Sequence, residues 1–331
     1  MKLVVFSAQP HDRQFLGAAF DDRGHSLVYI EAGLTSETAA AAHDADAICC
    51  FVNDDLGADS LKALHENGIR HILLRCAGFN NVDLAVAGQL GLTILRVPEY
   101  SPAAVAEHTL ALILSLNRGI HRAWSRVREG DFRLAGLLGF DLSGKTVGII
   151  GTGRIGQRVC RILKGFGCHV IACDRQPDEQ LKTEGIEYVD LPTLLGESRI
   201  ISLHCPLTLE TRHLINRHSL TRTRKGVLLI NTSRGALVDT QALVHGLKSG
   251  HVGGVALDVY EEETGLFFAD HSMSVIKDDV FARLLTFPNV LITGHQGFFT
   301  EEALTNIAAT TLKNMESIVL GQPDPACVVR A

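Results

Sequence analysis

The stretch from Thr146 to Asp174 constrains the fold more than any other part of the chain. An apolar run over Thr146–Ile150 leads into the glycine pattern Gly151-Thr-Gly153-Arg-Ile-Gly156, which is followed by apolar residues at helical spacing. A second apolar run, His169–Cys173, then delivers Asp174. This order of strand, glycine turn, helix, strand and acid is typical of a dinucleotide-binding unit with a parallel sheet.

Each glycine of this pattern has a physical task. Gly151 permits a tight turn, Gly153 lets a pyrophosphate approach the backbone, and Gly156 lets the helix pack closely on the strand. The N-terminus of that helix offers free N–H groups and a partial positive charge to phosphates. The sequence therefore predicts a dinucleotide site at the start of this helix.

Asp174 indicates which dinucleotide binds. It lies 18 residues after Gly156, close to the spacing at which an acid reaches the ribose hydroxyls of NAD. The same carboxylate would repel the extra phosphate of NADP, so the sequence favours NAD. The neighbouring Arg175 leaves NADP open, because a guanidinium there could accommodate a 2′-phosphate.

The length of 331 residues predicts two domains, and the alternation of strands with helices predicts parallel sheets wound on both faces. Short apolar runs predict strands at Leu3–Phe6, Leu27–Ile30, Ala47–Val52, His71–Leu74, Leu92–Leu95, Ile200–Leu203, Val227–Ile230, Val255–Leu257 and Val290–Ile292. Helical spacing predicts helices at Asp12–Arg23, Glu37–Ala42, Ser60–Asn67, Asp83–Leu90, Leu191–Leu195, Thr240–Lys248, Asp278–Leu285 and Glu301–Leu320.

A domain boundary is expected near residue 101. Pro98 and Pro102 bracket a short extended crossing, and a long helical pattern follows from Ala103 to about Asn117. A long connection through residues 128–143 then leads to the glycine stretch. The second domain should be a Rossmann sheet that spans about residues 101 to 297.

Charge and composition exclude several classes of protein. The net charge is −6 and the pI is about 6.2, so no basic surface for nucleic acid or anionic lipid is indicated. No apolar run approaches membrane-spanning length, and the N-terminus does not resemble a signal peptide, so we expect a soluble cytoplasmic protein without a membrane partner. The eight cysteines lack a CxxC pattern and the fifteen histidines lack HExxH spacing. We expect small buried thiols and no metal.

Three ionisable residues follow three of the predicted strands. Arg234 follows the strand that ends at Ile230, Glu263 comes shortly after the strand that ends at Leu257, and His295 follows the strand near 290–292. Because the carboxyl ends of parallel strands lie at one edge of a sheet, we expect all three to face the cofactor crevice.

The chemistry of these side chains is complementary. Arginine can grip a carboxylate through two charge-assisted hydrogen bonds, and histidine beside glutamate is a natural general acid. Together with a nicotinamide cofactor, these three side chains fit the reduction of a 2-keto acid. The spacing alone also allows Arg234 to be a surface cation, His295 to be a solvated loop residue, and Glu261 or Glu262 to replace Glu263.

Long stretches of the chain resemble the D-2-hydroxyacid dehydrogenase family, and most closely the fermentative D-lactate dehydrogenases. The family motifs are Gly151–Gly156 with Asp174, Leu203–Thr208, Asn231–Gly235, Asp258–Glu263 and Thr293–Phe298. The subgroup is indicated by Phe51–Asp55, Pro98–Ser101, Leu266–Phe268, Asp278–Phe281 and Gly294–Gln296. Many family members carry Pro before the catalytic His; this chain has Gly294, which the lactate subgroup shares.

The resemblance implies a role for each matching position. It assigns Arg234 to the substrate carboxylate, His295 to proton transfer and Glu263 to the histidine's partner. The other positions are assigned to substrate or cofactor contacts. Substrate contacts are implied at the backbone amides of Ala77 and Gly78 and at Tyr100 and Phe298. Cofactor contacts are implied at Arg154, Ile155, Cys205, Pro206, Thr232 and Asp258, in addition to the three glycines and Asp174.

The resemblance also implies an architecture and a reaction. Residues 1–100 with 299–331 would form a substrate domain and residues 101–298 an NAD-binding domain, both Rossmann-like or flavodoxin-like, with a cleft between them. Bulky groups at Tyr100 and Phe298 would favour pyruvate and D-lactate. The family is typically dimeric or larger, often through the helix after Ser101 and the following arm, so a homodimer or homotetramer is expected.

Two alternatives remain at this point. The substrate could be another D-2-hydroxy acid, such as hydroxyisocaproate, phenyllactate or glycerate, which would require a roomier pocket. Some transcriptional corepressors that sense NAD share the fold and even the three ionisable residues. Against that class, the sequence contains no disordered tail for partner binding.

Overall fold

The computed structural model describes residues 1–330, and the chain forms two compact units. The first unit contains Met1–Ser101 and the chain from Phe298 onward, and the second contains Pro102–Gly297. Each unit has its own sheet, in which all neighbouring strands are parallel. The predicted pair of parallel-sheet α/β units is therefore confirmed.

The sheet of the first unit has the strand order β2-β1-β3-β4-β5. Its strands are β1 (Lys2–Val5), β2 (Ser26–Tyr29), β3 (Ala47–Cys50), β4 (His71–Leu74) and β5 (Thr93–Arg96). The central strand β3 has the sequence Ala-Ile-Cys-Cys and is buried throughout. A continuous apolar run of this kind is what a parallel strand covered on both faces requires.

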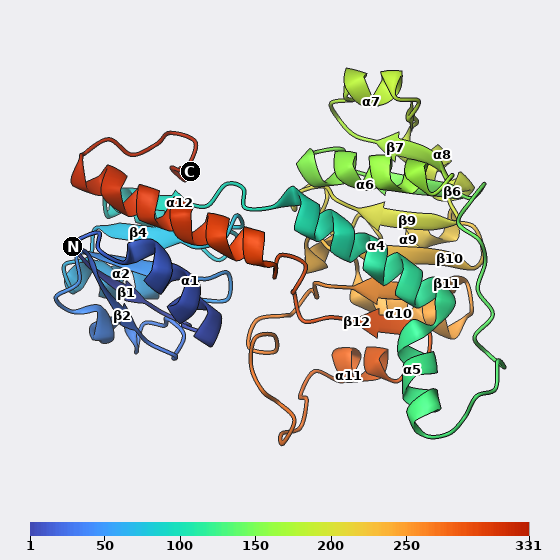
Figure 1. Cartoon of the computed structure of the whole chain (residues 1–331), viewed down its shortest axis with the longest axis horizontal. Coiled ribbons are helices and arrows are strands. Elements are labelled where there is room, and N and C mark those ends of the chain that lie inside the picture. The colour runs from blue at the N-terminus through green and yellow to red at the C-terminus, as the bar shows by residue number, and fades with distance from the viewer. Residues whose placement is uncertain (331) are drawn as a thin grey trace. The chain divides into compact units, whose positions relative to one another are not determined.

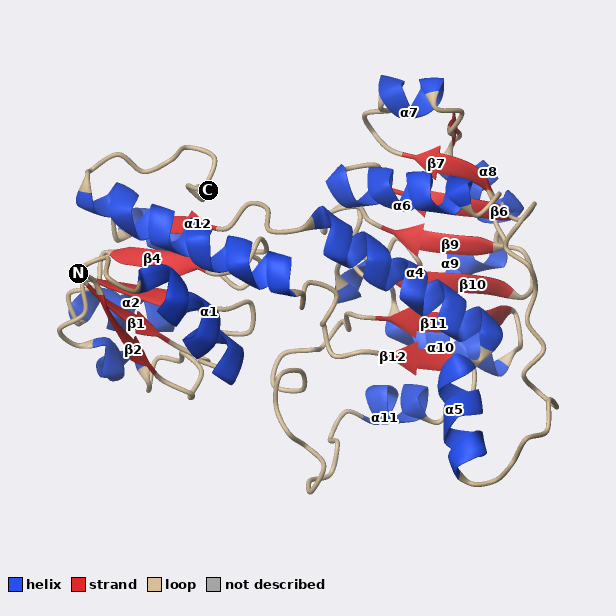
Figure 2. Ribbon diagram, in the orientation of Figure 1, coloured by secondary structure: helices blue, strands red, loops and turns tan. Residues whose placement is uncertain are grey.

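Helices cover both faces of this sheet (Figure 2). They are α1 (Pro10–Phe20), the 3-10 helix η1 (Ala39–Ala42), α2 (Ala58–Glu66), α3 (Leu84–Gln89) and α12 (Glu301–Val319). On one face α1 and α12 pack together, and Leu16 and Ala308 share a buried cluster with Val5. On the other face Leu61 of α2 and Ala87 of α3 pack against strand residues.

The sheet of the second unit has the strand order β12-β11-β10-β9-β6-β7-β8 (Figure 1). Its strands are β6 (Thr146–Ile150), β7 (His169–Cys173), β8 (Glu187–Tyr188), β9 (Ile200–Leu203), β10 (Val227–Asn231), β11 (Val252–Leu257) and β12 (Val290–Ile292). The order reverses at β6, which pairs with β7 on one side and β9 on the other. Open parallel sheets bind ligands at such a switch point, beyond the carboxyl ends of the strands.

Two layers of helices enclose this second sheet. They are α4 (Pro102–Arg118), α5 (Ile120–Arg128), α6 (Arg154–Gly165), α7 (Glu179–Thr183), α8 (Leu191–Glu197), α9 (Arg217–Thr221), η2 (Gly235–Leu237), α10 (Thr240–Lys248) and α11 (Asp279–Leu285). Helices α4 and α6 cover one face, where Ile113 and Leu163 join a buried cluster with Ile149. Helices α8 to α11 contribute to the cluster on the opposite face, which contains Ile150.

The structure contains several elements that the sequence analysis did not predict. The sequence pattern did not indicate α5, α7, α9 or β8, because three of these elements have only two to five residues and α5 buries none of its nine. The apolar residues of α5 lie at helical spacing but face solvent. The segment Glu37–Ala42, expected to be helical, contains only the 3-10 helix η1.

The cysteines behave as small apolar side chains. All eight are unpaired, and only Cys173 is not fully buried. Burial raises the pKa of Cys49 to about 12 and that of Cys205 to about 11, so these thiols stay protonated at neutral pH. Within residues 1–330, no helix is both long and apolar enough to cross a membrane, and no cluster of three His, Cys, Asp or Glu side chains could hold a metal ion.

Candidate active site

The glycine turn lies at the switch point, directly after β6. Gly151 has a φ of +94°, and a Cβ atom built on it would lie 2.4 Å from the backbone nitrogen of Cys205. A Cβ on Gly156 would lie 2.0 Å from the carbonyl oxygen of Gly151, so helix α6 can approach the turn only if this residue is glycine. By contrast, a Cβ on Gly153 would meet no atom within 4 Å. The turn thus leaves open space at the N-terminus of α6.

The start of α6 suits a phosphate group. The helix has no side-chain cap, because its N-cap residue is Gly153, and its first intrahelical bond runs from the Gln157 N–H to the Gly153 carbonyl. The N–H groups of the first turn therefore face outward from the helix end. Arg154 is exposed, whereas the side chain of Ile155 packs against the core, which leaves only its backbone for a ligand.

Asp174 follows β7 and lies against the same turn. Its carboxylate accepts hydrogen bonds from the Thr152 N–H (2.6 Å) and from the Thr152 hydroxyl (3.1 Å). The Gln176 N–H donates to its other oxygen at 2.9 Å. The side chain is half-buried, whereas Arg175 is exposed. The carboxylate is thus held beside the glycine turn, where it can accept from ribose hydroxyls, and the residues around the turn fit NAD.

The segment after β9 forms the opposite wall of the turn. Cys205 is buried, its backbone lies against Gly151, and its carbonyl oxygen accepts a hydrogen bond from the Ser233 hydroxyl at 2.8 Å. Pro206 is exposed. Burial lowers the pKa of the preceding His204 to about 4, so its imidazole is neutral and pairs with the Ser202 hydroxyl at 2.8 Å.

Arg234 lies in a tightly supported loop after β10. The buried Asn231 donates a hydrogen bond to the Arg234 carbonyl at 2.8 Å and accepts one from the Ser233 N–H at 3.0 Å. The next residue, Gly235, packs so closely on Tyr260 that a Cβ would lie 2.0 Å from its backbone. The half-buried Arg234 side chain donates only to the Ser233 carbonyl, at 2.7 Å, among the described residues. Most of its N–H groups remain available to a ligand.

His295 and Glu263 form a hydrogen-bonded pair. The Nδ1 atom of His295 lies 3.1 Å from Oε1 of Glu263, and both side chains are largely shielded from solvent. The other two acids of the run lie elsewhere: Glu261 contacts His213 and Thr240, and Glu262 is exposed. The structure therefore places Glu263, and neither of its neighbours, beside His295.

The backbone of His295 adopts a left-handed conformation, with a φ of +52°. Such a conformation is costly for a residue with a side chain and persists only where its surroundings enforce it. The enforcing group is Asp258, whose carbonyl accepts the His295 N–H at 2.7 Å. The ring of Phe268 packs 5.8 Å from the imidazole, centroid to centroid. The ring is thus held from two sides, by Glu263 and by Phe268.

Asp258 organises the loop that carries His295. Its carboxylate is 2% exposed and accepts from the Thr293 hydroxyl (2.5 Å), the Gln296 N–H (2.9 Å) and the Gly297 N–H (2.8 Å). Burial raises its pKa, but hydrogen bonds from His108 and Thr293 outweigh burial and hold the pKa below its ordinary value. The carboxylate is therefore ionised at neutral pH.

Sequence reasoning missed His108, which completes this network from helix α4. Its Nε2 atom lies 3.2 Å from Oδ1 of Asp258 and 3.1 Å from the Thr293 hydroxyl. The next residue of the same helix is Thr109, whose hydroxyl lies 2.9 Å from that of Thr232, another position predicted to face the cofactor. No local pattern signals these contacts, because they join residues more than a hundred positions apart.

Two of the predicted substrate positions of the first unit, Tyr100 and Phe298, are in contact with each other. Tyr100 and Phe298 have ring centroids 6.1 Å apart, and the Phe51 ring lies 5.8 Å from that of Phe298. The loop after β4 carries Ala77 and Gly78; among the described residues, no acceptor is found for either amide N–H. The first unit therefore provides amide donors on this loop and an aromatic cluster formed by Phe51, Tyr100 and Phe298.

Comparisons with known proteins agree with this geometry. The model of the family described as D-isomer specific 2-hydroxyacid dehydrogenase, NAD binding domain, matches residues 110–297. The 2-hydroxyacid dehydrogenase A of Aspergillus oryzae is 54% identical over 333 residues, which cover 100% of this chain and 96% of that protein. The D-lactate dehydrogenase of Escherichia coli is 50% identical over 325 residues, covering 98% and 99%. A solved structure, the pyruvate reductase of Chlamydomonas reinhardtii, has a TM-score of 0.92 at 44% identity and covers 98% of this chain and 97% of that one.

Proposed function

Because the chain belongs to the D-isomer specific 2-hydroxyacid dehydrogenase family and is therefore an NAD-dependent dehydrogenase, we propose that it interconverts pyruvate and D-lactate. The observation that carries this proposal is the His295–Glu263 pair, which lies at the same sheet edge as the glycine turn and Arg234. The names of two similar proteins, a D-lactate dehydrogenase and a pyruvate reductase, support the choice of substrate.

The mechanism follows from the groups at this edge. Arg234 binds the substrate carboxylate through its planar fork of N–H groups. Protonated His295 donates its Nε2 proton to the carbonyl oxygen, while Glu263 at Nδ1 orients the ring and balances its positive charge. When bound, NADH supplies the hydride that attacks the carbonyl carbon. In the reverse direction His295 accepts the hydroxyl proton of D-lactate.

We propose a ligand contact for each of the remaining candidate positions. The first-turn amides at Arg154 and Ile155 hold the pyrophosphate, Cys205 and Pro206 contact the adenosine side, and Asp174 accepts from the ribose hydroxyls. The amides of Ala77 and Gly78 add to the grip on the substrate carboxylate. In this assignment, the first unit is the substrate domain and the second is the NAD-binding domain.

The choice of pyruvate depends on the aromatic side chains of the first unit. Tyr100 and Phe298 are in edge contact, and we expect these bulky rings to favour a methyl-sized substrate side chain such as that of pyruvate. Initial rates of NADH oxidation with pyruvate, 2-ketoisocaproate, phenylpyruvate and hydroxypyruvate test the choice, with chiral analysis of the product. We expect pyruvate to give the highest kcat/KM and D-lactate to be formed. A preference for a larger keto acid would remove the lactate assignment while leaving the family mechanism intact.

Asp174→Ala is expected to narrow the preference for NADH over NADPH. Loss of the carboxylate removes hydrogen bonds to the ribose, which should lower kcat/KM for NADH about tenfold, and it removes the repulsion of a 2′-phosphate. The ratio of kcat/KM for the two cofactors is the measurement. Asp190→Ala is the matched control, because Asp190 caps helix α8 without lying at the turn. An unchanged ratio in Asp174→Ala would mean that another residue selects the cofactor.

His108→Ala is expected to lower kcat about tenfold, which corresponds to an activation free energy higher by ~1.4 kcal/mol. The Kd for NADH should stay unchanged. The substitution removes a hydrogen bond to Asp258 that lowers the pKa of this carboxyl. Because the pKa of Asp258 is lower in the folded protein than in the unfolded chain, its ionised form stabilises the loop at any pH above the ordinary pKa of the carboxyl group. This stabilisation is lost as the pH falls through the pKa of Asp258 in the folded protein. Activity in the variant should therefore be lost at a higher pH on the acid side.

The pH profile separates this role of His108 from simple packing. His108→Gln retains an N–H donor, so it should restore most of the kcat. The pH at which activity is lost on the acid side of the profile should also return towards that of the wild type. If alanine and glutamine variants have the same acid limb as the wild type, His108 does not act through Asp258.

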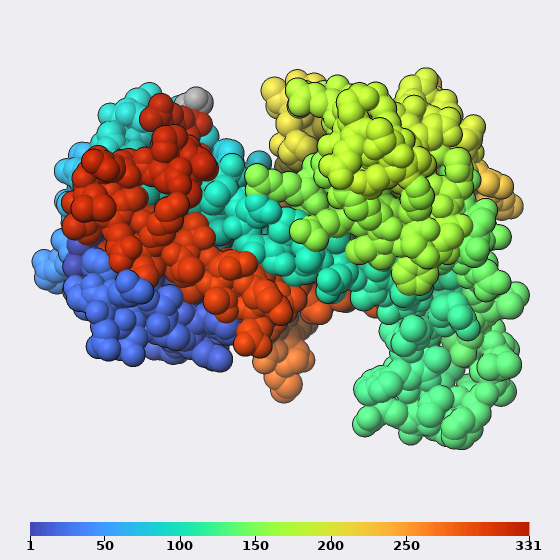
Figure 3. All heavy atoms as spheres, turned by 45° about the horizontal axis from the view of Figure 1, so that its top comes forward, coloured from blue at the N-terminus to red at the C-terminus, as the bar shows by residue number. Residues whose placement is uncertain are grey.

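We propose that two copies associate through α5 and the return segment, defined as residues 129–145. This part projects from the second unit (Figure 3) and exposes Trp124 at 63%, Phe132 at 74% and Leu134 at 83%. A group of large apolar side chains in solvent is typical of a protein interface. Light scattering should give a homodimer or homotetramer, and a monomer at micromolar concentration would contradict the proposal.

We also propose a cytoplasmic location. All eight cysteines are unpaired, which fits a reducing compartment. Cell fractionation tests this, and recovery in an oxidising compartment would contradict it.

A further inference from the structure

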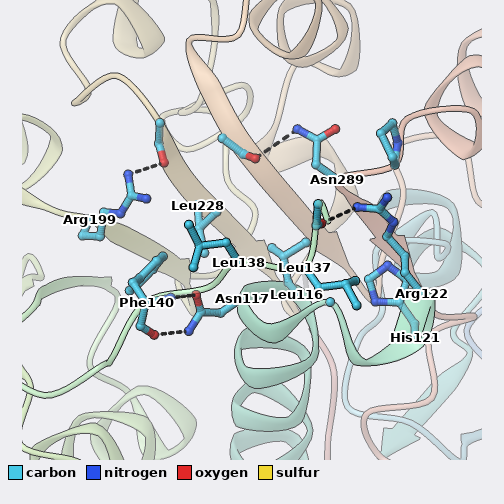
Figure 4. Close-up of a pocket in the computed structure, with 15 residues that line it drawn as sticks. Leu116, Asn117, His121, Arg122, Leu137, Leu138, Phe140, Arg199, Leu228 and Asn289 are labelled. Atoms are coloured by element: carbon cyan, nitrogen blue, oxygen red, sulfur yellow. Dashed lines mark hydrogen bonds between the residues drawn. The ribbon is translucent and has the colours of Figure 1, made fainter. Parts of the chain in front are cut away.

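A cavity of about 280 Å³ lies in the second unit at the sheet edge opposite the glycine turn. It is lined by residues at or just before the amino ends of strands, among them Arg199 before β9, Gly226 before β10 and Asn289 before β12. The junction of α4 and α5 and part of the return segment complete its wall (Figure 4). The proposed active site uses the carboxyl ends of these strands, so this cavity is separate from it.

The lining of the cavity is positively charged. Arg122 and Arg199 contribute guanidinium groups, and no Asp or Glu is among the residues that line it. Burial lowers the pKa of His121, against a smaller opposing effect of a backbone hydrogen bond, so this imidazole is neutral at pH 7. The charge of the lining therefore comes from the two arginines.

Both arginines are held in place and keep donors for a ligand. Arg199 donates from one Nη to the Gly226 carbonyl at 2.7 Å, and its guanidinium lies 4.6 Å from the centre of the Phe140 ring. Arg122 donates to the Gly136 carbonyl of the return segment at 3.2 Å. A guanidinium has five N–H groups, so each arginine has donors beyond the one these bonds use. Fixed, charged donors of this kind recognise carboxylates and phosphates.

Leucine side chains line part of the cavity between the arginines. Figure 4 shows the labelled leucine side chains between Arg199 and Arg122, and they come from α4, β10 and the return segment. The volume is near the lower limit of about 300 Å³ for small-molecule sites. A ligand that satisfies this lining is small, carries an anionic group at each end and has a short carbon chain between them.

We propose that this cavity is a second ligand site, which binds a small organic acid with two anionic groups. One group binds Arg199, the other binds Arg122, and the carbon chain lies against the leucines. Because Arg122 also contacts the return segment, the bound acid links that segment to the amino edge of the sheet. The site is independent of the assignment of pyruvate as substrate.

Calorimetry and thermal unfolding with succinate as the probe test this site in the full-length protein. Succinate has two carboxylates and no keto group, and butyrate is the matched probe with one carboxylate. We expect succinate to bind and to raise the Tm, and butyrate to bind at least about tenfold more weakly. Hydrogen exchange should show that succinate protects backbone amides of residues 134–141.

The variants locate the site. Arg122→Gln and Arg199→Gln should each weaken succinate binding about tenfold or more, and Arg217→Gln should not, because Arg217 is an exposed arginine outside the cavity. Arg199 also supports Gly226, so Arg122→Gln decides the question if Arg199→Gln lowers the Tm. Arg234→Gln should retain succinate binding. The proposal is overturned if succinate does not bind, if binding survives Arg122→Gln, if Arg234→Gln abolishes it, or if butyrate binds equally well.

Discussion

Replacing His295 with glutamine is expected to lower kcat for pyruvate reduction by roughly 10² to 10⁴. Glutamine has a similar length and an N–H donor, but it cannot release a proton to the carbonyl oxygen. The Kd for NADH should stay unchanged, because the His295 side chain is not among the proposed cofactor contacts. The steady-state rate of pyruvate reduction at saturating NADH is the measurement.

The chain contains a close control for this substitution. His213 also contacts a glutamate, Glu261, and also has a left-handed backbone, with a φ of +51°. His213→Gln therefore disturbs a similar pair in the same unit without touching the proposed site. We expect its kcat to stay within a few-fold of the wild type. If the two variants lose activity equally, or if His295→Gln keeps a tenth of it, His295 is not the proton donor.

The nucleotide-binding turn could be predicted from sequence because its determinants are local. The positive φ of Gly151 and the contact of Gly156 with the Gly151 carbonyl both arise within six residues of chain, and the strand and helix around them have strong apolar periodicity. The bounds of β6 and β7 match the predicted apolar runs residue for residue. Parallel topology then places the later strand ends at the same edge, so Arg234 and His295 could be predicted as site candidates.

The network behind His295 could not be predicted, because it depends on packing between distant segments. His108 meets Asp258 only because α4 crosses the sheet near β11 and β12, and the contact spans 150 positions in sequence. The choice among three adjacent glutamates was also open. It depends on how the chain turns after β11, which gives Glu261 to His213 and Glu263 to His295.

Helix α5 and the cavity beside it show a second limit. The residues Ile120, Trp124 and Val127 are spaced as one helical face, but each is at least half exposed, so that face is not buried by the described residues. A sequence pattern reports that apolar residues share a face and does not report what covers it. The cavity depends on Arg122 and Arg199, which are brought together by the return segment and not by any motif.

Arg234→Lys is expected to lower kcat/KM for pyruvate by about 10- to 100-fold, and Arg234→Gln by about 10² to 10⁴. Lysine keeps the charge but replaces a planar fork with a single ammonium group, so one of two charge-assisted hydrogen bonds is lost. Glutamine loses both the charge and the fork. If the carboxylate is gripped more tightly as the carbonyl is reduced, KM should rise and kcat should fall together.

The binding of oxamate, a carboxylate that resembles pyruvate, separates anchoring of the substrate from damage to the loop. Its Ki should rise in parallel with the loss of kcat/KM, while the Kd for NADH stays constant because Asn231 still supports the loop backbone. Arg212→Lys is the control, since Arg212 is an exposed arginine of the same unit that lies 3.5 Å from Glu261. Near-normal kinetics in Arg234→Lys would show that the fork does not anchor the substrate. A parallel loss of NADH affinity would instead place Arg234 in the cofactor site.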